Sequence, residues 1–324
     1  MSELKTIGIL TSGGDAPGMN AAIRAAARTA LACGLKVKGI KRGYAGLLNN
    51  EIIDMNSRMV SEIARQGGTI LFTARCDEFK REECQKQGAQ ILKNHGIDGL
   101  IVIGGDGSFR GAQALSKLGI NTIAIPGTID LDIDCTDYTI GFDTAVNTAM
   151  CAIDKIKDTS MSHERCSIIE VMGRNAGYIA LWCRIANGAD GILIPEKEEF
   201  DEQELVDTIM HNRARGKKHH VIINAEGIGH TNRLARRIEA ATGIETRATV
   251  LGHIQRGGSP TARDRVVAST MGAYAVDLLY RKATNRVICY KDGKYVDFDI
   301  DEGLAMKKEI DEYQYLVSRL MSIY

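Results

Sequence analysis

The chain has 324 residues, of which 44% are apolar and 25% charged, and its 41 basic residues are balanced by 41 acidic residues. This length predicts about two domains with substantial cores. The neutral net charge argues against a nucleic-acid-binding protein, which usually carries a basic excess. No apolar run approaches the roughly 20 residues of a membrane span, and the first residues lack the character of a signal peptide. We therefore expect a cytoplasmic protein that binds neither nucleic acid nor membranes.

Short β-branched runs alternate with longer helical patterns along the chain. Continuously apolar strands separated by helices are typical of parallel sheets covered on both faces, so the pattern predicts an α/β fold. The predicted strands are Thr6–Leu10, Val37–Ile40, Gly99–Ile103, Thr122–Ile125, Ser167–Val171, Ile192–Ile194, Val221–Asn224 and Ala248–Leu251. The predicted helices lie near Ala16–Ala32, Glu78–Asn94, Gly107–Leu118, Asp143–Lys157, Gly177–Ala186, Glu202–Asn212, Asn232–Ala241 and Ala262–Leu279. The sequence KDGK at Lys291–Lys294 predicts a hairpin late in the chain.

The eight cysteines show neither a C-x-x-C pair nor any metal-ligand spacing. Several, such as Cys151 and Cys183, lie within apolar segments. We interpret the cysteines as reduced side chains that pack as small hydrophobic residues.

Glycine and a charged residue follow five of the predicted strands. The strand sequences GILT, LIVI, TIAI, IIEV and ATVL run into SGGDAPG, GGDGS, PGTIDLD, MGRNAG and GHIQRGG. Ligands of open α/β sheets bind at the carboxyl ends of strands, where glycine lets backbone N–H groups approach a phosphate. The first turn, with Gly13, Gly14 and Gly18, fits neither the dinucleotide spacing nor a Walker-type loop. A phosphate bound there would need positive charge from elsewhere.

Three carboxylates are candidates for chemistry at these turns. Asp106 either caps the following helix or is a ligand of Mg²⁺, which prefers one or two carboxylates with waters and phosphate oxygens. In an extended segment Asp130 and Asp132 share one side, with Thr128 in line and Leu131 opposite. Two such carboxylates suit a division of labour between a proton acceptor and a metal ligand. A solvated acidic turn is the alternative interpretation.

Five arginines near glycine turns or strand ends are candidates for the missing positive charge, because arginine offers a bidentate fork to phosphate. Each of them taken alone fits a surface ion pair better than a ligand contact. His253 is a candidate general base or, beside Arg256, a donor to phosphate or a hydroxyl. Glu226 is a candidate acceptor from sugar hydroxyls, although structural roles for both remain open. The run RGKKHH is normally a solvated surface. The arginines are Arg75, Arg165, Arg174, Arg247 and Arg256.

Through these motifs the chain closely resembles the bacterial ATP-dependent 6-phosphofructokinases. The match runs in order through LTSGGDAPGMNAAIR, IGGDGS, PGTIDLD, YTIGFDTA, DTSMSHER, VMGRNAG, RATVLGHIQRGGSP and MGAYA. The resemblance implies two α/β/α sandwich (Rossmann-like) domains with mostly parallel sheets, an active site in the cleft between them, and a homotetramer. It implies a larger ATP-binding domain of residues 1–141 plus about 255–305. The smaller fructose-6-phosphate-binding domain would comprise about 142–254 plus 306–324.

The resemblance also assigns roles to residues, with Mg²⁺ as cofactor, ATP as co-substrate and fructose 6-phosphate as substrate. Asp130 would be the base that deprotonates the 1-hydroxyl of the sugar. The other catalytic residues would be Gly14, Thr128, Asp132 and Arg174, and Asp106 and Asp132 would hold the metal. ATP would contact Gly14, Arg75, Cys76, Gly105, Asp106, Gly107 and Ser108. The substrate site would comprise Thr128, Ile129, Asp130, Met172, Gly173, Arg174, Glu226, His253, Ile254, Gln255 and Arg256, with Arg165 and Arg247 from a neighbouring subunit.

A regulatory site for ADP or phosphoenolpyruvate is implied at a subunit interface, although charge on a helix surface is an alternative explanation. Its residues would be Arg24, Arg28, Arg58, Lys157, Gly188, Asp190, Arg215, Lys217 and His219. The chain departs from the family at Lys157, where arginine is usual, and at Asp190, where glutamate is usual. The basic position near Arg58 is displaced by one residue.

Two further features bear on the activity that the resemblance implies. Pyrophosphate-using relatives carry aspartate and lysine where this chain has Gly107 and Gly127, and the small residues leave room for the α-phosphate of ATP. Leu131 replaces the asparagine of the family's TIDND motif. We expect activity to survive this change. A non-catalytic regulator that binds nucleotide and sugar phosphate, and a pyrophosphate-dependent kinase, are the alternatives.

Overall fold

A computed structural model of the chain describes residues 4–197 and 202–321. The chain divides into two compact units, one formed by residues 1–144 and 256–308, the other by residues 145–255 and 309–324. Each unit is a parallel or mostly parallel sheet with helices on both faces, which confirms the predicted fold class. Within the described residues, no helix is long and apolar enough to cross a membrane.

The sheet of the first unit has seven strands in the order β11-β10-β5-β4-β1-β2-β3. The central pairs are parallel, whereas the edge strands β3 and β11 are antiparallel to their neighbours. The strands are β1 (Thr6–Ser12), β2 (Lys36–Ile40), β3 (Ile52–Met55), β4 (Gly99–Gly104), β5 (Asn121–Pro126), β10 (Arg286–Lys291) and β11 (Lys294–Asp299).

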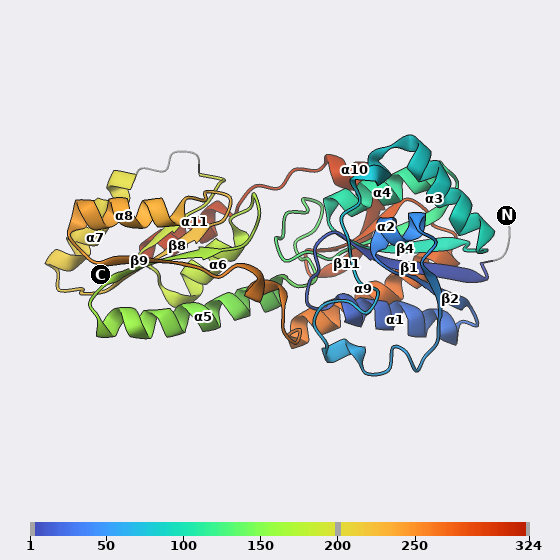
Figure 1. The fold of residues 1–324 in the computed structure, drawn as a ribbon, viewed down its shortest axis with the longest axis horizontal. Helices are drawn as coiled ribbons and strands as arrows, with labels where there is room; N and C mark the ends of the chain where they lie inside the picture. Colours follow the sequence, from blue (N-terminus) through green and yellow to red (C-terminus); the bar gives the residue numbers. More distant parts are fainter. Residues whose placement is uncertain (1–3, 198–201, 322–324) are drawn as a thin grey trace. The chain divides into compact units, whose positions relative to one another are not determined.

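Helices cover both faces of this sheet, with α1 and α9 on one face and α2, α3, α4 and α10 on the other (Figure 1). Their bounds are α1 (Met19–Ala32), α2 (Gly43–Leu48), α3 (Glu82–Asn94), α4 (Asp106–Lys117), α9 (Ala262–Tyr280) and α10 (Ile300–Ala305). Two short 3-10 helices, η1 (Ile63–Arg65) and η2 (Asp77–Lys80), lie in the long connection between β3 and α3.

The sheet of the second unit has four parallel strands in the order β7-β8-β6-β9. Helices α7 and α8 lie on one face and α5 and α6 on the other, with α11 packed on α6 (Figure 1). The strands are β6 (Cys166–Val171), β7 (Gly191–Leu193), β8 (His220–Ala225) and β9 (Thr246–Val250). The helices are α5 (Phe142–Ser162), α6 (Tyr178–Asn187), α7 (Glu202–Ala214), α8 (Thr231–Thr242) and α11 (Glu312–Leu320), and η3 (Gly252–Arg256) follows β9.

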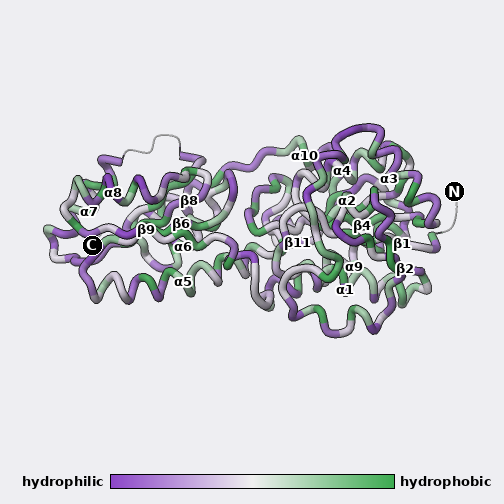
Figure 2. The backbone as a smooth tube through the Cα atoms, viewed as in Figure 1, coloured by the Kyte–Doolittle hydropathy of each residue, from purple (hydrophilic) through white to green (hydrophobic). Residues whose placement is uncertain are grey.

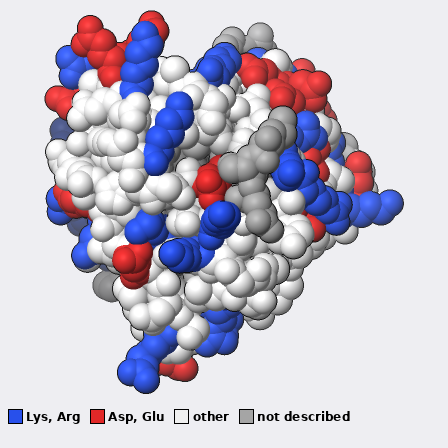
Figure 3. Space-filling view, turned by 90° about the vertical axis from the view of Figure 1, so that its right-hand side faces the viewer, with Lys and Arg blue, Asp and Glu red and all other residues white. Residues whose placement is uncertain are grey.

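Each unit has its own hydrophobic core beneath its helices. Leu10, Val102 and Ala124 come from adjacent strands of the first unit and share one cluster with Phe109 of α4. In Figure 2 the hydrophobic positions follow the strands, and the hydrophilic positions lie mostly on the outer helix faces. On the face in Figure 3, lysine and arginine are interspersed with aspartate and glutamate, as the balanced charge of the sequence leads one to expect.

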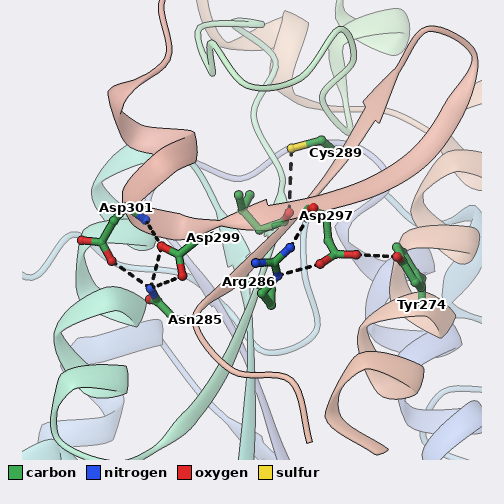
Figure 4. A network of polar contacts seen from close by, with 8 residues as sticks. Tyr274, Asn285, Arg286, Cys289, Asp297, Asp299 and Asp301 are labelled. Atoms are coloured by element: carbon green, nitrogen blue, oxygen red, sulfur yellow. Dashed lines mark hydrogen bonds and ion pairs between the residues drawn. The ribbon is translucent and has the colours of Figure 1, made fainter. Parts of the chain in front are cut away.

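The β10–β11 hairpin confirms the turn expected at Lys291–Lys294. Asp292 and Gly293 have φ values of 50° and 77°, the left-handed pair that a two-residue hairpin turn requires. Polar contacts fix the base of the hairpin (Figure 4). Arg286 donates to the Asp297 carboxylate at 2.6 Å, and the Tyr274 hydroxyl of α9 donates to the other oxygen of Asp297 at 2.5 Å. These contacts attach the edge of the sheet to α9.

Several elements differ from the sequence expectation. Helix α3 begins at Glu82 rather than near Glu78, because residues 77–80 form a separate 3-10 turn. The sequence pattern missed β3, α2, α10 and α11. These are short elements of 4 to 9 residues. Such elements span too few turns or residues to show a clear hydrophobic period.

All eight cysteines are free thiols, as expected from their spacing. Cys183 is buried, as its apolar surroundings predict, whereas the prediction that Cys151 packs in the interior is wrong. Cys151 lies on an exposed position of α5, because helical periodicity and not local hydrophobicity decides which face is buried. Two buried thiols of the first unit, Cys135 and Cys289, are in contact, with their sulfur atoms 3.4 Å apart.

Candidate active site

Three neighbouring strands of the first unit end at the same level. In the β1–β4–β5 ladder, Ser12 is paired with Gly104, and Gly104 is paired with Pro126. The glycine turns that follow these strands therefore meet at one edge of the sheet, where open α/β sheets bind their ligands.

The turn after β1 lies beneath the Arg256 guanidinium. Arg256 donates from Nη1 to the main-chain oxygen of Asp15 at 3.1 Å. A methyl group on Gly14 would come within 2.6 Å of the same nitrogen. On the other side, the Thr73 hydroxyl donates to the oxygen of Gly13 at 2.8 Å. Only a residue without a side chain at position 14 lets the cation approach the turn this closely.

The turn after β4 leads into the amino terminus of α4. Gly105 is the N-cap residue and no side chain caps the helix, so the capping interpretation of Asp106 is wrong. Asp106 is the first helical residue, and its half-exposed side chain makes an ion pair with Arg110 at 3.2 Å. A side chain on Gly105 or Gly107 would meet nothing within 4 Å. The helix terminus is therefore open, and its N–H groups favour an anion.

Ser108 closes the inner side of this turn. Its hydroxyl donates to the oxygen of Ser12 at 3.2 Å, and its own main-chain oxygen accepts from the buried Tyr44 hydroxyl at 2.6 Å. Burial raises the pKa of Tyr44 far above its usual range, so this phenol remains a hydrogen-bond donor. No sequence pattern pointed to Tyr44, which packs beneath α4 from α2.

The turn after β5 carries the two aspartates. Asp130 is 6% exposed, and its main-chain N–H donates to the Thr128 hydroxyl at 3.2 Å. Asp132 is half-buried. The expectation of an extended segment is wrong at Leu131, which has a φ of 57° in the left-handed region. A branched side chain is unfavourable there by about 1–2 kcal/mol, so the surrounding structure must hold this conformation.

Lys308 lies behind this turn, and the sequence pattern did not single it out. Its Nζ donates to the main-chain oxygens of Leu131 at 2.9 Å, Thr136 at 3.1 Å and Ile133 at 3.4 Å. Burial lowers the pKa of Lys308, and the carboxylates of Asp134, Asp137 and Asp132 act in the opposite direction.

Gly127 does not face open space. A side chain there would press on methyl groups of Ile103 and Met19, 3.0 and 3.1 Å away. The argument that both glycines leave room for a ligand therefore holds only for Gly107, which is open. Packing against β4 and α1 is the local reason for glycine at position 127.

The strands of the second unit also end together, since Val171 is paired with Ala225 and Glu170 with Val250. Gly173 and Arg174 follow β6 with φ values of 141° and 56°. The turns after these strands therefore form a second edge where ligands can bind.

Side chains from two turns bind the main chain of the turn that follows β6. Glu226, which follows β8, accepts a hydrogen bond from the main-chain N–H of Arg174 and donates its own N–H to Val171 at 2.9 Å. Gln255 is fully buried and accepts from the N–H of Met172 at 3.3 Å. The exposed residues of this group include Arg174, Gly227, His253 and Ile254.

Arg165 and Arg247 lie at the amino ends of the strands of the second sheet, opposite the turns described above. Arg165 precedes β6, and Arg247 is the second residue of β9. Both contact Glu245, at 3.7 and 2.7 Å. Both arginines therefore lie near strand ends, as the sequence pattern predicts. Strand direction places them at the amino ends.

The residues expected at a regulatory site fall into two clusters, one in each unit. In the second unit, Asp190 is almost fully buried and accepts from Lys217 at 2.5 Å, from the N–H of Val221 at 2.9 Å and from Asn212 at 3.2 Å. Lys157 donates to the oxygen of Asn187 at 2.7 Å, beside Gly188 at the end of α6.

Electrostatics connect the members of the second-unit cluster. Burial raises the pKa of Asp190, but the His220 imidazole, whose Nδ1 lies 3.7 Å from the carboxylate, and the charge of Lys217 outweigh it and bring the pKa to about 2. Burial and the nearby Lys217 ammonium lower the pKa of His219. Arg215 is exposed at the end of α7.

In the first unit, Arg24 and Arg28 lie one turn apart on α1. Arg24 donates to the oxygen of Ser61 at 3.4 Å, and the Ser61 hydroxyl donates to the oxygen of Arg58 at 2.9 Å.

Two residues expected to contact ATP lie in the connection between β3 and α3. Arg75 is exposed and Cys76 precedes η2.

Parallel α/β units with glycine turns and charged side chains at the carboxyl ends of adjacent strands are typical of proteins that bind phosphorylated ligands. Comparison with known proteins narrows this class. The sequence model of the family described as Phosphofructokinase matches residues 6–279. The chain belongs to the phosphofructokinase family.

Relatives match over almost the whole chain. An ATP-dependent 6-phosphofructokinase of Clostridium botulinum (strain Hall) is 57% identical over 319 residues, which cover 98% of this chain and 100% of the relative. A protein of the same name from Clostridium novyi is also 57% identical over 319 residues, with the same coverage.

Solved structures show the same fold. Phosphofructokinase from Saccharomyces cerevisiae superposes with a TM-score of 0.85 at 34% identity, over 98% of this chain and 48% of the yeast chain. The chain thus spans about half the length of that relative. A pyrophosphate-dependent phosphofructokinase from Marinobacter aquaeolei, at 20% identity over 98% of this chain and 91% of that chain, has a TM-score of 0.85 and supports the fold alone.

Proposed function

We propose that this protein is an ATP-dependent 6-phosphofructokinase, which transfers the γ-phosphoryl group of Mg-ATP to the 1-hydroxyl of fructose 6-phosphate and acts in glycolysis. The observation that carries the proposal is the 57% identity to proteins of that name over their entire length. The meeting of the three glycine turns at one sheet edge supports it, because phosphoryl transfer depends on positioning and electrostatics rather than covalent steps.

Asp130 is the proposed general base. It accepts the proton of the 1-hydroxyl as that oxygen attacks the γ-phosphorus, and ADP is the leaving group. The nearly buried position of Asp130 supports this role, because water is kept from the carboxylate. Thr128 and Arg174 stabilise the charge on the transferring phosphoryl group, and Ile129, between Thr128 and Asp130 in the sequence, is assigned to the substrate site.

ATP is proposed to bind over the turns after β1 and β4. The open space at Gly105 and Gly107 and the free amino terminus of α4 support a polyphosphate there. The contacts are assigned to Gly14, Arg75, Cys76, Gly105, Asp106, Gly107 and Ser108.

Mg²⁺ fits the carboxylates of Asp106 and Asp132. In residues 4–197 and 202–321, no group of three or more His, Cys, Asp or Glu side chains is arranged to hold a metal ion. Mg²⁺ takes one or two carboxylates and completes its shell with water and phosphate oxygens. The ion, when bound, neutralises phosphate charge.

Fructose 6-phosphate is proposed to bind the turns of the second unit together with Arg256. Glu226 would accept from sugar hydroxyls, and His253 and Arg256 would contact the phosphate. Arg165 and Arg247 are assigned to a neighbouring subunit of a homotetramer, and their place at the opposite edge of the sheet supports that assignment. The remaining contacts are assigned to Met172, Gly173, Ile254 and Gln255.

We further propose a cytoplasmic protein with an effector site for ADP or phosphoenolpyruvate, shared between subunits. The two basic clusters of each chain support this proposal. Asp190 does not extend toward a ligand in the way that the family's glutamate is expected to, because three donors already occupy its carboxylate.

The test is steady-state formation of fructose 1,6-bisphosphate by purified protein with Mg²⁺, with ATP or pyrophosphate as donor. We expect turnover with ATP alone, and a loss of about 10²–10⁴-fold in kcat for Asp130→Ser. Turnover with pyrophosphate would refute the choice of donor. Binding of both ATP and fructose 6-phosphate without turnover would support the non-catalytic regulator instead.

A further inference from the structure

The turn that carries Asp130 is held from behind by a single ammonium group. Main-chain oxygens of Leu131, Ile133 and Thr136 converge on Nζ of Lys308 within 2.9 to 3.4 Å. An ammonium has three N–H donors, so one lysine can bind three carbonyl groups and fix their directions together.

The first of these oxygens belongs to the strained residue of the turn. Leu131 follows Asp130 directly and has a φ of 57°. A leucine leaves this conformation readily unless other contacts hold the chain. The Lys308 bond to its oxygen fixes the peptide group that joins Leu131 to Asp132, and hence the backbone on which both aspartates stand.

Apolar side chains hold the same segment from one side. Leu131, Ile133 and Cys135 are buried, whereas Asp132 and Asp134 between them are only half-buried. This alternation fixes which side chains face the core. The Ile133 oxygen also accepts from the main-chain N–H of Thr136 at 3.3 Å, whereas the oxygens of Leu131 and Thr136 accept from Lys308.

We propose that Lys308 is a positioning residue that aims Asp130 at the reacting hydroxyl by holding the main chain of residues 131–136. The inference rests on the proposed kinase function for its kinetic effect. Lys308 is also the last residue of the first unit before the chain passes into the second unit at Glu309, so it anchors this crossing to the turn with the proposed base.

The kinetic test compares Lys308→Met with Lys307→Met. Both remove one ammonium group, but the neighbouring Lys307 is exposed. We expect Lys308→Met to lower kcat by about 10²-fold, because a misplacement near 1 Å has that effect, while both KM values change by less than about threefold. Lys307→Met should match the unchanged protein. Lys308→Arg, which keeps the charge and the donors, should recover most of kcat.

A double variant separates positioning from general stability. If Lys308 acts through Asp130, Asp130→Ser combined with Lys308→Met should be no slower than Asp130→Ser alone. Independent losses that multiply in the double variant would overturn the proposal. So would a Lys308→Met protein with normal kcat and only a lower melting temperature. If Lys308→Met does not fold, Lys308→Gln, which keeps two donors without the charge, takes its place.

Amide hydrogen exchange tests the same idea without activity. Residues 129–136 should exchange faster in Lys308→Met than in Lys307→Met, with the rest of the sheet unchanged. Unaltered exchange there would overturn the proposal. If the unchanged protein transfers no phosphoryl group, the proposed function fails, and the exchange experiment still decides whether Lys308 holds the turn.

Discussion

At the scale of single residues, the missing side chain at Gly14 decides where the Arg256 guanidinium can lie. The nearest atoms to a methyl group at position 14 belong to the end of this flexible side chain and not to the backbone. Gly14 also lacks a positive φ, so alanine fits the local conformation. The effect of a substitution should therefore fall on the site and not on the fold.

We expect Gly14→Ala to lower kcat/KM by about 10²-fold, the usual loss when one charge-stabilising contact is displaced. Thermal stability should change by less than about 1 kcal/mol, because the guanidinium can move aside. Arg256→Ala should show a similar kinetic loss, and the double variant should be no worse than Arg256→Ala. Additive losses would show that the two residues act separately. The measurements are steady-state kinetics and thermal unfolding.

Replacing Leu131 with asparagine would have two opposing effects on the stability of the folded state. Asparagine tolerates the left-handed region better, which favours it by about 1 kcal/mol. Leu131 is only 6% exposed, however, and losing its buried side chain costs about 2 kcal/mol.

Leu131→Asn should therefore lower the free energy of unfolding by about 1 kcal/mol, measured by urea titration. Because Lys308 already holds the main chain, kcat/KM should stay within about threefold of its original value. Leu131→Ala is the control and should be less stable than Leu131→Asn, because it loses the burial and gains nothing at φ. A gain in kcat above tenfold for Leu131→Asn would mean that leucine misaims Asp130.

At the scale of secondary-structure elements, Asp190 joins the start of β7 to β8 and α7. Its carboxylate accepts from the N–H of Val221, from Asn212 and from Lys217. The pKa of about 2 lies below the ordinary value of 3.8, so the folded state favours the ionised carboxylate. Its stabilising effect is complete above about pH 4 and is lost as the pH falls toward 2.

Asp190→Asn should lower the free energy of unfolding by about 2 kcal/mol at pH 7, and the difference from the unchanged protein should shrink toward zero near pH 2. Fluorescence of the chain's one tryptophan, Trp182 in α6, reports on this unit. The exposed Asp207→Asn on α7 serves as the control and should change little. A difference that does not depend on pH would show that the ionised carboxylate is not what stabilises the unit.

The long strands and helices could be predicted from the sequence because hydrophobic periodicity depends only on neighbours along the chain. The contacts of Asp190, Gly14 and Lys308 could not, because their partners are separated from them by 22 to 242 residues. Lys308 in particular has no motif, and only the path of the chain after α10 brings it behind the β5 turn.

At the scale of the whole molecule, strand direction places Arg165 and Arg247 away from the turns of their own unit. We propose that they complete the site of a neighbouring subunit in a homotetramer. Subunits with different defects should then complement each other, because oligomers with shared sites combine residues from two chains.

We expect Asp130→Ser and Arg247→Ala proteins to be weakly active when assembled alone and to recover activity when refolded together. Random mixing should restore about a quarter of the sites, those with the base from one chain and the arginine from the other. A mixture of Asp130→Ser with Gly14→Ala should not recover, because both changes lie in the same half of the site. Recovery in the control, or none in the test mixture, would contradict a shared site.

The α/β class, the family and the positions of the glycine turns could be predicted from the sequence, because periodic hydrophobicity and local turn chemistry act between residues close in the chain. Three features could be seen only in the tertiary structure. These are which strands end together, the left-handed backbone conformation of Leu131, and the contacts of Lys308 and Arg256 with their turns. Those outcomes depend on strand order and register, which are set by packing between distant segments and leave no local pattern in the sequence.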